Sequence, residues 1–172
     1  MKTLIPLLAL LCLAACVAET AADLAPPRVD VVFVNPDKFS DVRDGDPGSD
    51  RGRDEYLKRI KEHIESQVNK YIPEGQHLAL HITDVKLAGD FEPWRGPAFS
   101  DVRYIKDLYP PRINLEFRLT DANGKIIKQG GRKITDEDFM TEINLYFPDD
   151  TLRYEKQLLD NWLNDEFGLV RK

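Results

Sequence analysis

The strongest constraint on the fold of this chain is a pair of strands in its second half. Apolar and polar residues alternate over residues 113–119, as in a strand with one buried face. The turn sequence at 121–124 follows, and residues 125–129 return as a second strand that the glycines at 130–131 are expected to end. This hairpin favours a fold built around an antiparallel sheet.

Apolar residues at helical spacing predict two amphipathic helices, one before and one after the hairpin. The first runs from Asp54, as its N-cap, to about Tyr71, and the second covers 151–167 and ends at Gly168. The residues expected to face the core are Leu57, Ile60, Ile64, Val68 and Ile72 in the first helix and Leu152, Leu158, Leu159, Trp162 and Leu163 in the second.

Further strands are expected at residues 29–34, 78–87 and 102–105. Together the elements predict an α+β fold, with an antiparallel-dominated sheet of about four to five strands and two amphipathic helices packed on one face. The strands at 29–34 and 78–87 are expected to form a parallel pair, because a helix connects them.

The N-terminus has the features of an export signal. Lys2 gives a positive start, and residues 4–13 are apolar but too short to cross a membrane, which takes about 20 apolar residues. Residues 13–16 read Leu-Ala-Ala-Cys, which predicts cleavage before Cys16 and acylation of its thiol, as in bacterial lipoproteins. Val17 after the cysteine favours the outer membrane. The alternative is cleavage after Ala18, which would release a soluble periplasmic protein.

The predicted organisation is a signal peptide at residues 1–15, a flexible tether at 16–27 and a single globular α+β domain at 28–172. The formal net charge of −6 argues against binding to nucleic acid or to anionic lipid headgroups. Cys12 and Cys16 are the only cysteines and both lie in the export region, so cysteine chemistry is excluded from the folded part. We therefore expect membrane contact through a lipid on Cys16, and no cofactor.

Residues 91–111 form a loop that combines aromatic residues with prolines. The candidate partner surface in this loop consists of Phe91, Trp94, Phe99, Tyr104 and Tyr109. The alternative is a flap that folds over the core, because a domain of this size must cover both faces of its sheet.

Acidic residues near the start of the first helix are a candidate for calcium binding. Asp44, Asp46 and Glu55 match positions one, three and twelve of a calcium loop, but Gly48 and Ser49 do not match positions five and six. A solvated loop is therefore the favoured interpretation, and no metal site is assigned.

Other polar residues favour structural roles. His77 and His81 share one strand face roughly 13 Å apart, at about 3.3 Å per residue, so they are not expected to share a metal ion. Asp84 and Asp90 flank a break in the strand pattern, where carboxylates are expected to accept hydrogen bonds from backbone N–H groups. No residue is assigned a catalytic role.

Several separated segments carry a family resemblance. Residues 82–93 read Ile-Thr-Asp-Val-Lys-Leu-Ala-Gly-Asp-Phe-Glu-Pro, and residues 32–39 read Val-Phe-Val-Asn-Pro-Asp-Lys-Phe. With residues 110–113, residues 154–156, Asp160 and Trp162, they resemble the DUF3016 family over about residues 28–165. The resemblance implies an exported protein of a Gram-negative bacterium and supplies no catalytic residues, because the function of the family is unknown.

The expected function is therefore that of a non-catalytic envelope lipoprotein, a binding or assembly module with another envelope protein as its partner. One alternative is a carboxylate-dependent periplasmic hydrolase, because Asp and Glu are plentiful near a loop with aromatic residues. A second alternative is a calcium-binding envelope protein.

Overall fold

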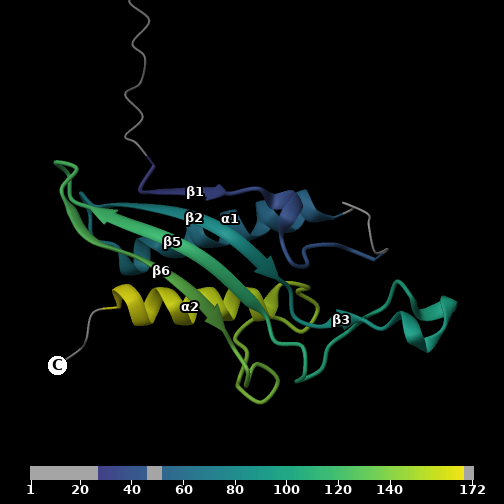
Figure 1. The fold of residues 1–172 in the computed structure, drawn as a ribbon. Coiled ribbons are helices and arrows are strands. Elements are labelled where there is room, and N and C mark those ends of the chain that lie inside the picture. Colours follow the sequence, from purple (N-terminus) through teal and green to yellow (C-terminus); the bar gives the residue numbers. More distant parts are fainter. Residues whose placement is uncertain (1–26, 46–51, 169–172) are drawn as a thin grey trace, which may run out of the picture.

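The computed structural model describes residues 27–45 and 52–168. Its centre is a sheet of four strands, β1 (Val29–Phe33), β2 (His77–Lys86), β5 (Arg112–Thr120) and β6 (Ile126–Thr135), in the order β1-β2-β5-β6 (Figure 1). β1 and β2 are parallel, and the other two neighbouring pairs are antiparallel. The predicted α+β fold is confirmed. The predicted parallel pairing of the two strands that a helix connects is confirmed as well.

Two helices, α1 (Arg53–Tyr71) and α2 (Arg153–Phe167), lie on the same side of the sheet (Figure 1). Every residue predicted to face the core from the two helices is buried. They meet alternate residues of β2 and β5, including Leu80 and Leu115, which are at most 2% exposed. The opposite face of the sheet has no covering layer among the described residues, so its side chains remain partly or fully in water.

The start of α1 differs from the prediction. Gly52, at φ 78°, occupies the N-cap position, and Asp54 lies inside the first turn without capping it. Glycine adopts this left-handed conformation without the steric cost that a Cβ would add. Asp54 and Glu55 still favour the helix start, because negative charge there complements the helix dipole.

The glycine pair Gly130–Gly131 does not end the second hairpin strand, as the sequence had suggested, because β6 continues to Thr135. A Cβ on Gly130 would lie 2.9 Å from Arg132 Nη1 and 3.4 Å from a ring carbon of Phe117. The absent side chain thus leaves room for the aromatic ring and for the guanidinium group 5.2 Å from its centre. The pair serves packing at the sheet edge and leaves the strand intact.

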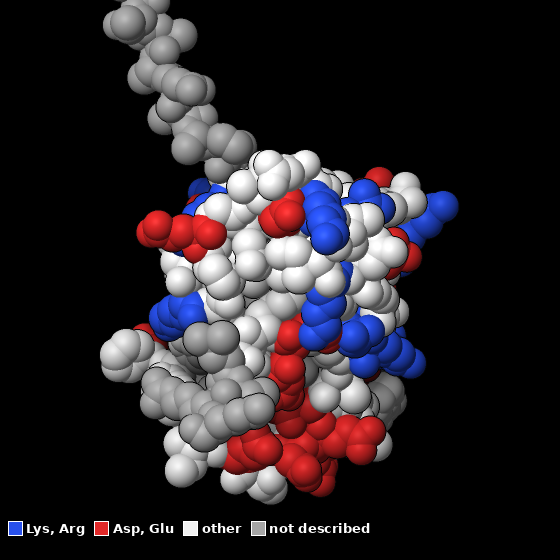
Figure 2. Space-filling model, turned by 90° about the vertical axis from the view of Figure 1, so that its left-hand side faces the viewer, with Lys and Arg blue, Asp and Glu red and all other residues white. Residues whose placement is uncertain are grey.

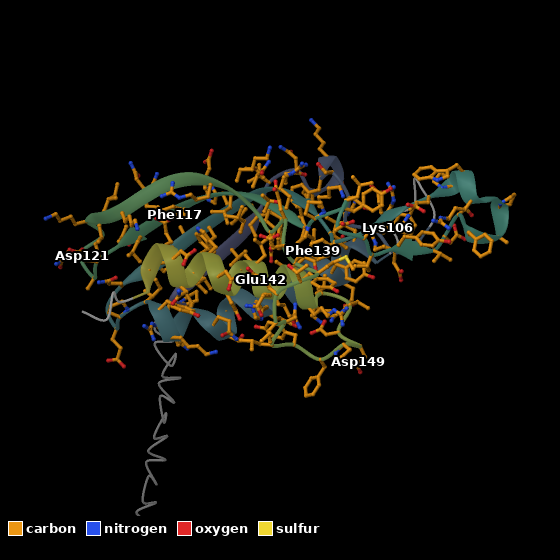
Figure 3. The ribbon with its side chains drawn as sticks, turned by 90° about the horizontal axis from the view of Figure 1, so that it is seen from below. Lys106, Phe117, Asp121, Phe139, Glu142 and Asp149 are labelled. Carbon is orange, nitrogen blue, oxygen red and sulfur yellow. The ribbon has the colours of Figure 1, made fainter. Side chains whose placement is uncertain are left out.

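Two segments outside the main layers carry most of the exposed apolar residues. Residues 87–111, between β2 and β5, contain the short strands β3 (Asp90–Phe91) and β4 (Arg103–Tyr104), which form a separate antiparallel ribbon. Residues 136–150 form a loop between β6 and α2, where Phe139 is buried and Glu142 lies over α2 (Figure 3). The predicted short strand at 102–105 is confirmed as β4.

Candidate functional site

Residues 90–109, called the arm from here on, project from one end of the domain (Figure 1). The end of the domain with Lys106 lies opposite the hairpin turn with Asp121 (Figure 3). Beyond the β3–β4 ribbon, the arm contains two 3₁₀ turns, η2 (Pro93–Arg95) and η3 (Pro97–Phe99). Proline begins each turn because its fixed φ suits the first helical position.

A buried carboxylate holds the root of the arm together. Glu92 is 2% exposed, and its Oε1 accepts hydrogen bonds from Lys106 Nζ at 2.5 Å and from the Tyr109 hydroxyl at 3.0 Å. Its Oε2 accepts a hydrogen bond from Arg95. The hydrogen bond from Lys106, followed by that from Arg95, lowers the pKa of Glu92 to about 2. The carboxylate is therefore charged and fully used as an internal tie.

Arg103 fastens the arm to the body. Its two terminal nitrogens donate to the two oxygens of Asp41 at 2.9 and 3.0 Å, and one also donates to the carbonyl of Arg43. The guanidinium group also lies 4.5 Å from the centre of the Phe91 ring. Such a two-point contact fixes orientation as well as distance. The arm is thus anchored to the loop after β1.

The five aromatic residues predicted as a partner surface divide into two groups. Phe91 is buried, and Tyr104 and Tyr109 are partly buried against cationic side chains, with Arg95 4.6 Å from the Tyr104 ring. Trp94 and Phe99, by contrast, are 72% and 49% exposed. The arm therefore combines a charged, hydrogen-bonded root with an apolar tip.

Leu108 was missed as a surface residue, although it is 71% exposed. The sequence reasoning selected aromatic residues in this loop and passed over the aliphatic ones. Leu108 lies between Asp107 and Tyr109, in the run that directly precedes Pro110 and Pro111. This sequence was the available signal for a turn that exposes it.

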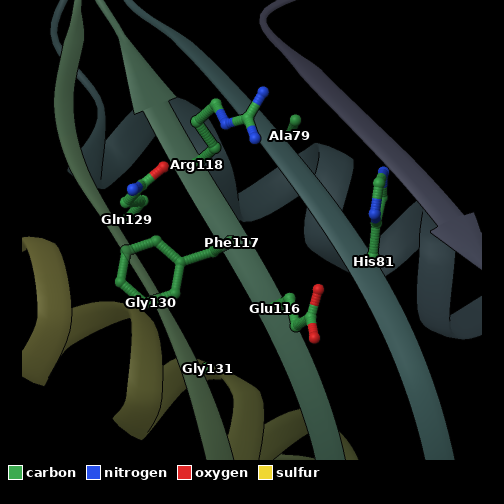
Figure 4. A pocket seen from close by; sticks show the side chains of 8 residues that line it. All are labelled: Ala79, His81, Glu116, Phe117, Arg118, Gln129, Gly130 and Gly131. Atoms are coloured by element: carbon green, nitrogen blue, oxygen red, sulfur yellow. The ribbon is translucent and has the colours of Figure 1, made fainter.

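A second candidate lies on the uncovered face of the sheet, where residues of β2, β5 and β6 surround a hollow of about 400 Å³ (Figure 4). His81 pairs across the strands with Glu116, which in turn pairs with Gly131. Arg118 lies between Ala79 and Gln129 in the adjacent row. Neither Glu116 nor Arg118 has an ion pair among the described residues. The hollow therefore offers charges of both signs to a polar ligand.

The histidines on this face are arranged as predicted. His77 and His81 lie on one side of β2, and His81 is exposed. Within residues 27–45 and 52–168, no group of three His, Cys, Asp or Glu residues is arranged to hold a metal ion. Of the candidate calcium ligands, Asp44 and Glu55 are exposed, and Asp46 lies outside the described residues.

Asp84 and Asp90 take the predicted structural role. Asp84 accepts hydrogen bonds from the backbone N–H and the hydroxyl of Ser40 at 2.6 and 2.8 Å. Burial alone would raise the pKa of Asp84, but these bonds and Arg112 lower it. Asp90 accepts the backbone N–H of Phe91 at 2.8 Å. The prediction for both carboxylates is confirmed.

A buried polar cluster between the helices was not predicted. His63 Nε2 lies 2.8 Å from Asp160 Oδ1, and the Tyr146 hydroxyl donates to Asp160 Oδ2 at 2.5 Å. Burial, with the bond to Asp160, raises the pKa of Tyr146. Ser66 donates to the carbonyl of His63, so its hydroxyl is not directed at the imidazole ring. The cluster joins α1, α2 and the 136–150 loop, and its contacts are those of a structural tie.

Glu155 is a second buried polar residue that was missed. It is 1% exposed, and its Oε1 accepts a hydrogen bond from Ala88 N at 2.6 Å. Its Oε2 has no hydrogen-bond partner among the described residues. Burial raises the pKa of Glu155 to about 7. Like His63 beside Ile60 and Ile64, it occupies an inward position of its helix, so helical spacing was the signal that could have identified both.

The features that predict export are not tested by the structure. Residues 1–15, Cys16 and the tether up to residue 26 lie outside the described residues. In the part of the chain that is described, no helix has the length and apolar character needed to cross a membrane.

Comparisons with known proteins give one informative match. No curated protein matches the sequence. A solved structure of a minor lipoprotein from Acinetobacter baumannii is matched at 9% identity over 81% of this chain and 88% of that one. The TM-score is 0.22, which is too low to indicate a shared fold. A family model described as a protein of unknown function, DUF3016, matches residues 27–165. This match spans the sheet and both helices down to Asp165, and the chain therefore belongs to the DUF3016 family.

Proposed function

We propose that this protein is a non-catalytic envelope lipoprotein whose arm binds another envelope protein. The observation that carries the proposal is the exposure of Trp94 and Leu108, at 72% and 71%, on a segment that Arg103 ties to Asp41 of the body. Large apolar side chains in water favour association, and tryptophan is among the residues that contribute most at protein interfaces.

The root of the arm supports the proposal through preorganisation. Glu92 and Arg103 between them bind Lys106, Tyr109, Arg95 and Asp41, so the arm is held in one conformation before a partner arrives. A segment that is ordered in advance loses less conformational entropy on binding, which leaves more of the contact energy as affinity.

The predicted lipid on Cys16 would supply the location. An acidic domain is not attracted to anionic headgroups, so stable attachment would depend on acyl chains, and two or more chains anchor a protein stably. The tether would then present the folded domain to proteins of the same membrane or of the periplasm. The predicted sorting to the outer membrane rests on Val17.

The experiment is site-specific photocrosslinking in intact cells. A photoreactive residue at Trp94 or Leu108 should give one discrete adduct, whereas the same residue at Asp121, at the opposite end of the domain, should give none. A Trp94→Ala, Leu108→Ala variant should lose the adduct formed from position 99 and keep its melting temperature. Equal adducts from positions 94 and 121 would overturn the arm as the partner surface, and a large drop in melting temperature would instead support the flap interpretation.

Carboxylate-dependent hydrolysis is the competing function. Two carboxylates, Asp44 and Asp150, line a pocket of about 250 Å³ near the root of the arm, but Asp150 is paired with Arg59 and Lys156 at 2.8 and 2.5 Å. If the protein were a hydrolase that uses Asp150, the Asp150→Asn variant would lose hydrolysis of its substrate. The same variant would still bind a partner protein through the arm. Calcium binding is tested by the melting temperature. Millimolar calcium should raise it only if Asp44, Asp46 and Glu55 bind the ion.

A further inference from the structure

A groove separate from the arm lies between β6 and α2. In the described sheet, β6 is an outer strand, so one of its edges pairs with no other strand. α2 runs alongside that edge (Figures 1 and 4), and the space between them is a groove of about 560 Å³. Residues 133–138 of the strand end line one wall, and Leu158 and Trp162 of α2 line the other.

The groove is strongly acidic. Its carboxylates are Asp136, Glu137, Asp138, Glu142 and Asp165. None of them has an ion pair among the described residues, and Lys133 is the one cation in the lining. Figure 2 shows acidic side chains gathered at the lower end of the face it presents. Burial, together with Glu142 and Asp138, raises the pKa of Asp136, as expected where like charges crowd.

The side of the groove formed by α2 includes two apolar residues, beside Asn161 and Asp165, and an unused donor. Leu158 and Trp162 are 4% and 5% exposed. The indole Nε1–H of Trp162 is buried and has no hydrogen-bond partner among the described residues. A buried donor without an acceptor costs free energy, which a ligand carbonyl could recover. This observation is independent of the acidic rim.

An apolar strip continues from the groove. Ile143, Leu145 and Phe147 are 86%, 79% and 81% exposed, and the strip begins directly after Glu142 in the groove wall. The residues between them hold the strip on α2, because Asn144 Nδ2 donates to the carbonyl of Arg153 at 3.0 Å and Tyr146 donates to Asp160. The strip is therefore a fixed apolar surface.

These features together select the occupant. The absence of a three-ligand cluster among the described residues argues against a bare metal ion, and the carboxylates would repel an anionic lipid surface. A small polyamine could satisfy the charges but would use neither the apolar strip nor the free strand edge. An extended peptide can use all three, with ammonium groups on the rim, apolar side chains on the strip and backbone groups along β6.

We propose that the groove between β6 and α2, with the strip at 143–147, binds an extended segment of a partner protein in which Lys or Arg alternates with apolar residues. Charge complementarity to the five carboxylates carries the proposal, and the apolar strip supplies the second half of the recognition.

The chain offers its own reporter for the test. It contains two tryptophans, so Trp94→Phe leaves Trp162 at the groove as the only one. A synthetic peptide of alternating Lys and Val should change the Trp162 emission in a saturable manner, and added salt should weaken binding, because exposed charges are screened. A peptide of alternating Glu and Val should give no saturable change.

Matched variants separate the contributions. Glu137→Gln with Glu142→Gln should weaken binding of the Lys–Val peptide about three- to tenfold, as expected for the loss of two exposed charge contacts. Glu62→Gln with Glu74→Gln makes the same change in net charge outside the groove and should leave binding unchanged. Leu145→Ala with Phe147→Ala should weaken the peptide but not spermine.

The outcomes decide the proposal. Equal affinity for spermine and the peptide would overturn it in favour of a small-polycation site. Equal effects of the two Glu→Gln pairs would overturn the groove as the binding site. Melting curves of each variant check that folding is retained, which is expected because all the substituted residues are exposed.

Discussion

The buried carboxyl of Glu155 makes the stability of this domain depend on pH in a predictable direction. Burial raises its pKa from the ordinary value of 4.5 to about 7, so the folded protein keeps this proton over a range in which the unfolded chain has lost it. Stability should therefore fall as the pH rises from about 4.5 to about 7 and then level off. The full difference is about 3 kcal/mol, at roughly 1.4 kcal/mol for each tenfold change in the ionisation constant.

Glu155→Gln tests this reasoning. Glutamine is neutral at every pH, and its carbonyl can still accept the hydrogen bond from Ala88 N, which is 2.6 Å from Oε1. The variant should match the wild type near pH 4.5 and exceed it by about 2–3 kcal/mol at pH 8, with part of the gain offset by the unpartnered amide nitrogen. Urea unfolding followed by circular dichroism at several pH values gives the free energy of unfolding directly.

A control with the opposite sign is available in Glu166. Burial alone would raise its pKa, but hydrogen bonds from Lys128 and Arg132 lower it. Glu166→Gln should therefore lose stability at neutral pH, and the loss should shrink as the pH falls through the lowered pKa. If the stability curves of Glu155→Gln and the wild type run parallel from pH 4.5 to 8, Glu155 does not titrate in this window and the reasoning fails.

Three further outcomes are expected. Gly89→Ala should destabilise the arm root by about 1–3 kcal/mol, because φ is 83° and a Cβ would lie 2.7 Å from the carbonyl oxygen of Tyr104, whereas Gly96→Ala, with no atom within 4 Å, should cost less in the same thermal unfolding assay. Leu159→Ala should lower the free energy of unfolding by about 2–5 kcal/mol in urea titrations, because Leu159 is fully buried in the core. Cys16→Ser should abolish incorporation of labelled palmitate and move the protein from the membrane to the soluble fraction; labelling that persists would refute the predicted lipid anchor.

Local periodicity was sufficient for the layers of this fold. The alternation at 113–119 and the helical spacing from Leu57 to Ile72 each identify a buried face without knowledge of its partner, and both are confirmed. The predicted strand end at Gly130 was wrong because the prediction considered only the backbone freedom of glycine. In β6 its small size is what matters, since Arg132 and the Phe117 ring fill the space beside it.

The arm could be located from the sequence, but its two faces could not be separated. Its aromatic residues differ in exposure because of ties formed with residues far along the chain, such as Arg103 with Asp41, which are 62 positions apart. Glu92 is buried because Lys106 and Tyr109 converge on it. No spacing rule relates these positions, so only the folded arrangement shows that Phe91 belongs to the root and Trp94 to the tip.

The strip at 143–147 shows why an apolar pattern identifies a period without identifying the inward face. Ile143, Leu145 and Phe147 alternate with polar residues as in a half-buried strand, yet here the polar residues face the protein. The orientation is reversed because the segment meets the polar side of α2, where Asp160 and the Arg153 carbonyl offer hydrogen-bond acceptors. Burying each such apolar side chain is worth about 1.5–3 kcal/mol, and the isolated domain does not recover that free energy. A partner that covers the strip would, which is why the reversed orientation points to a binding surface.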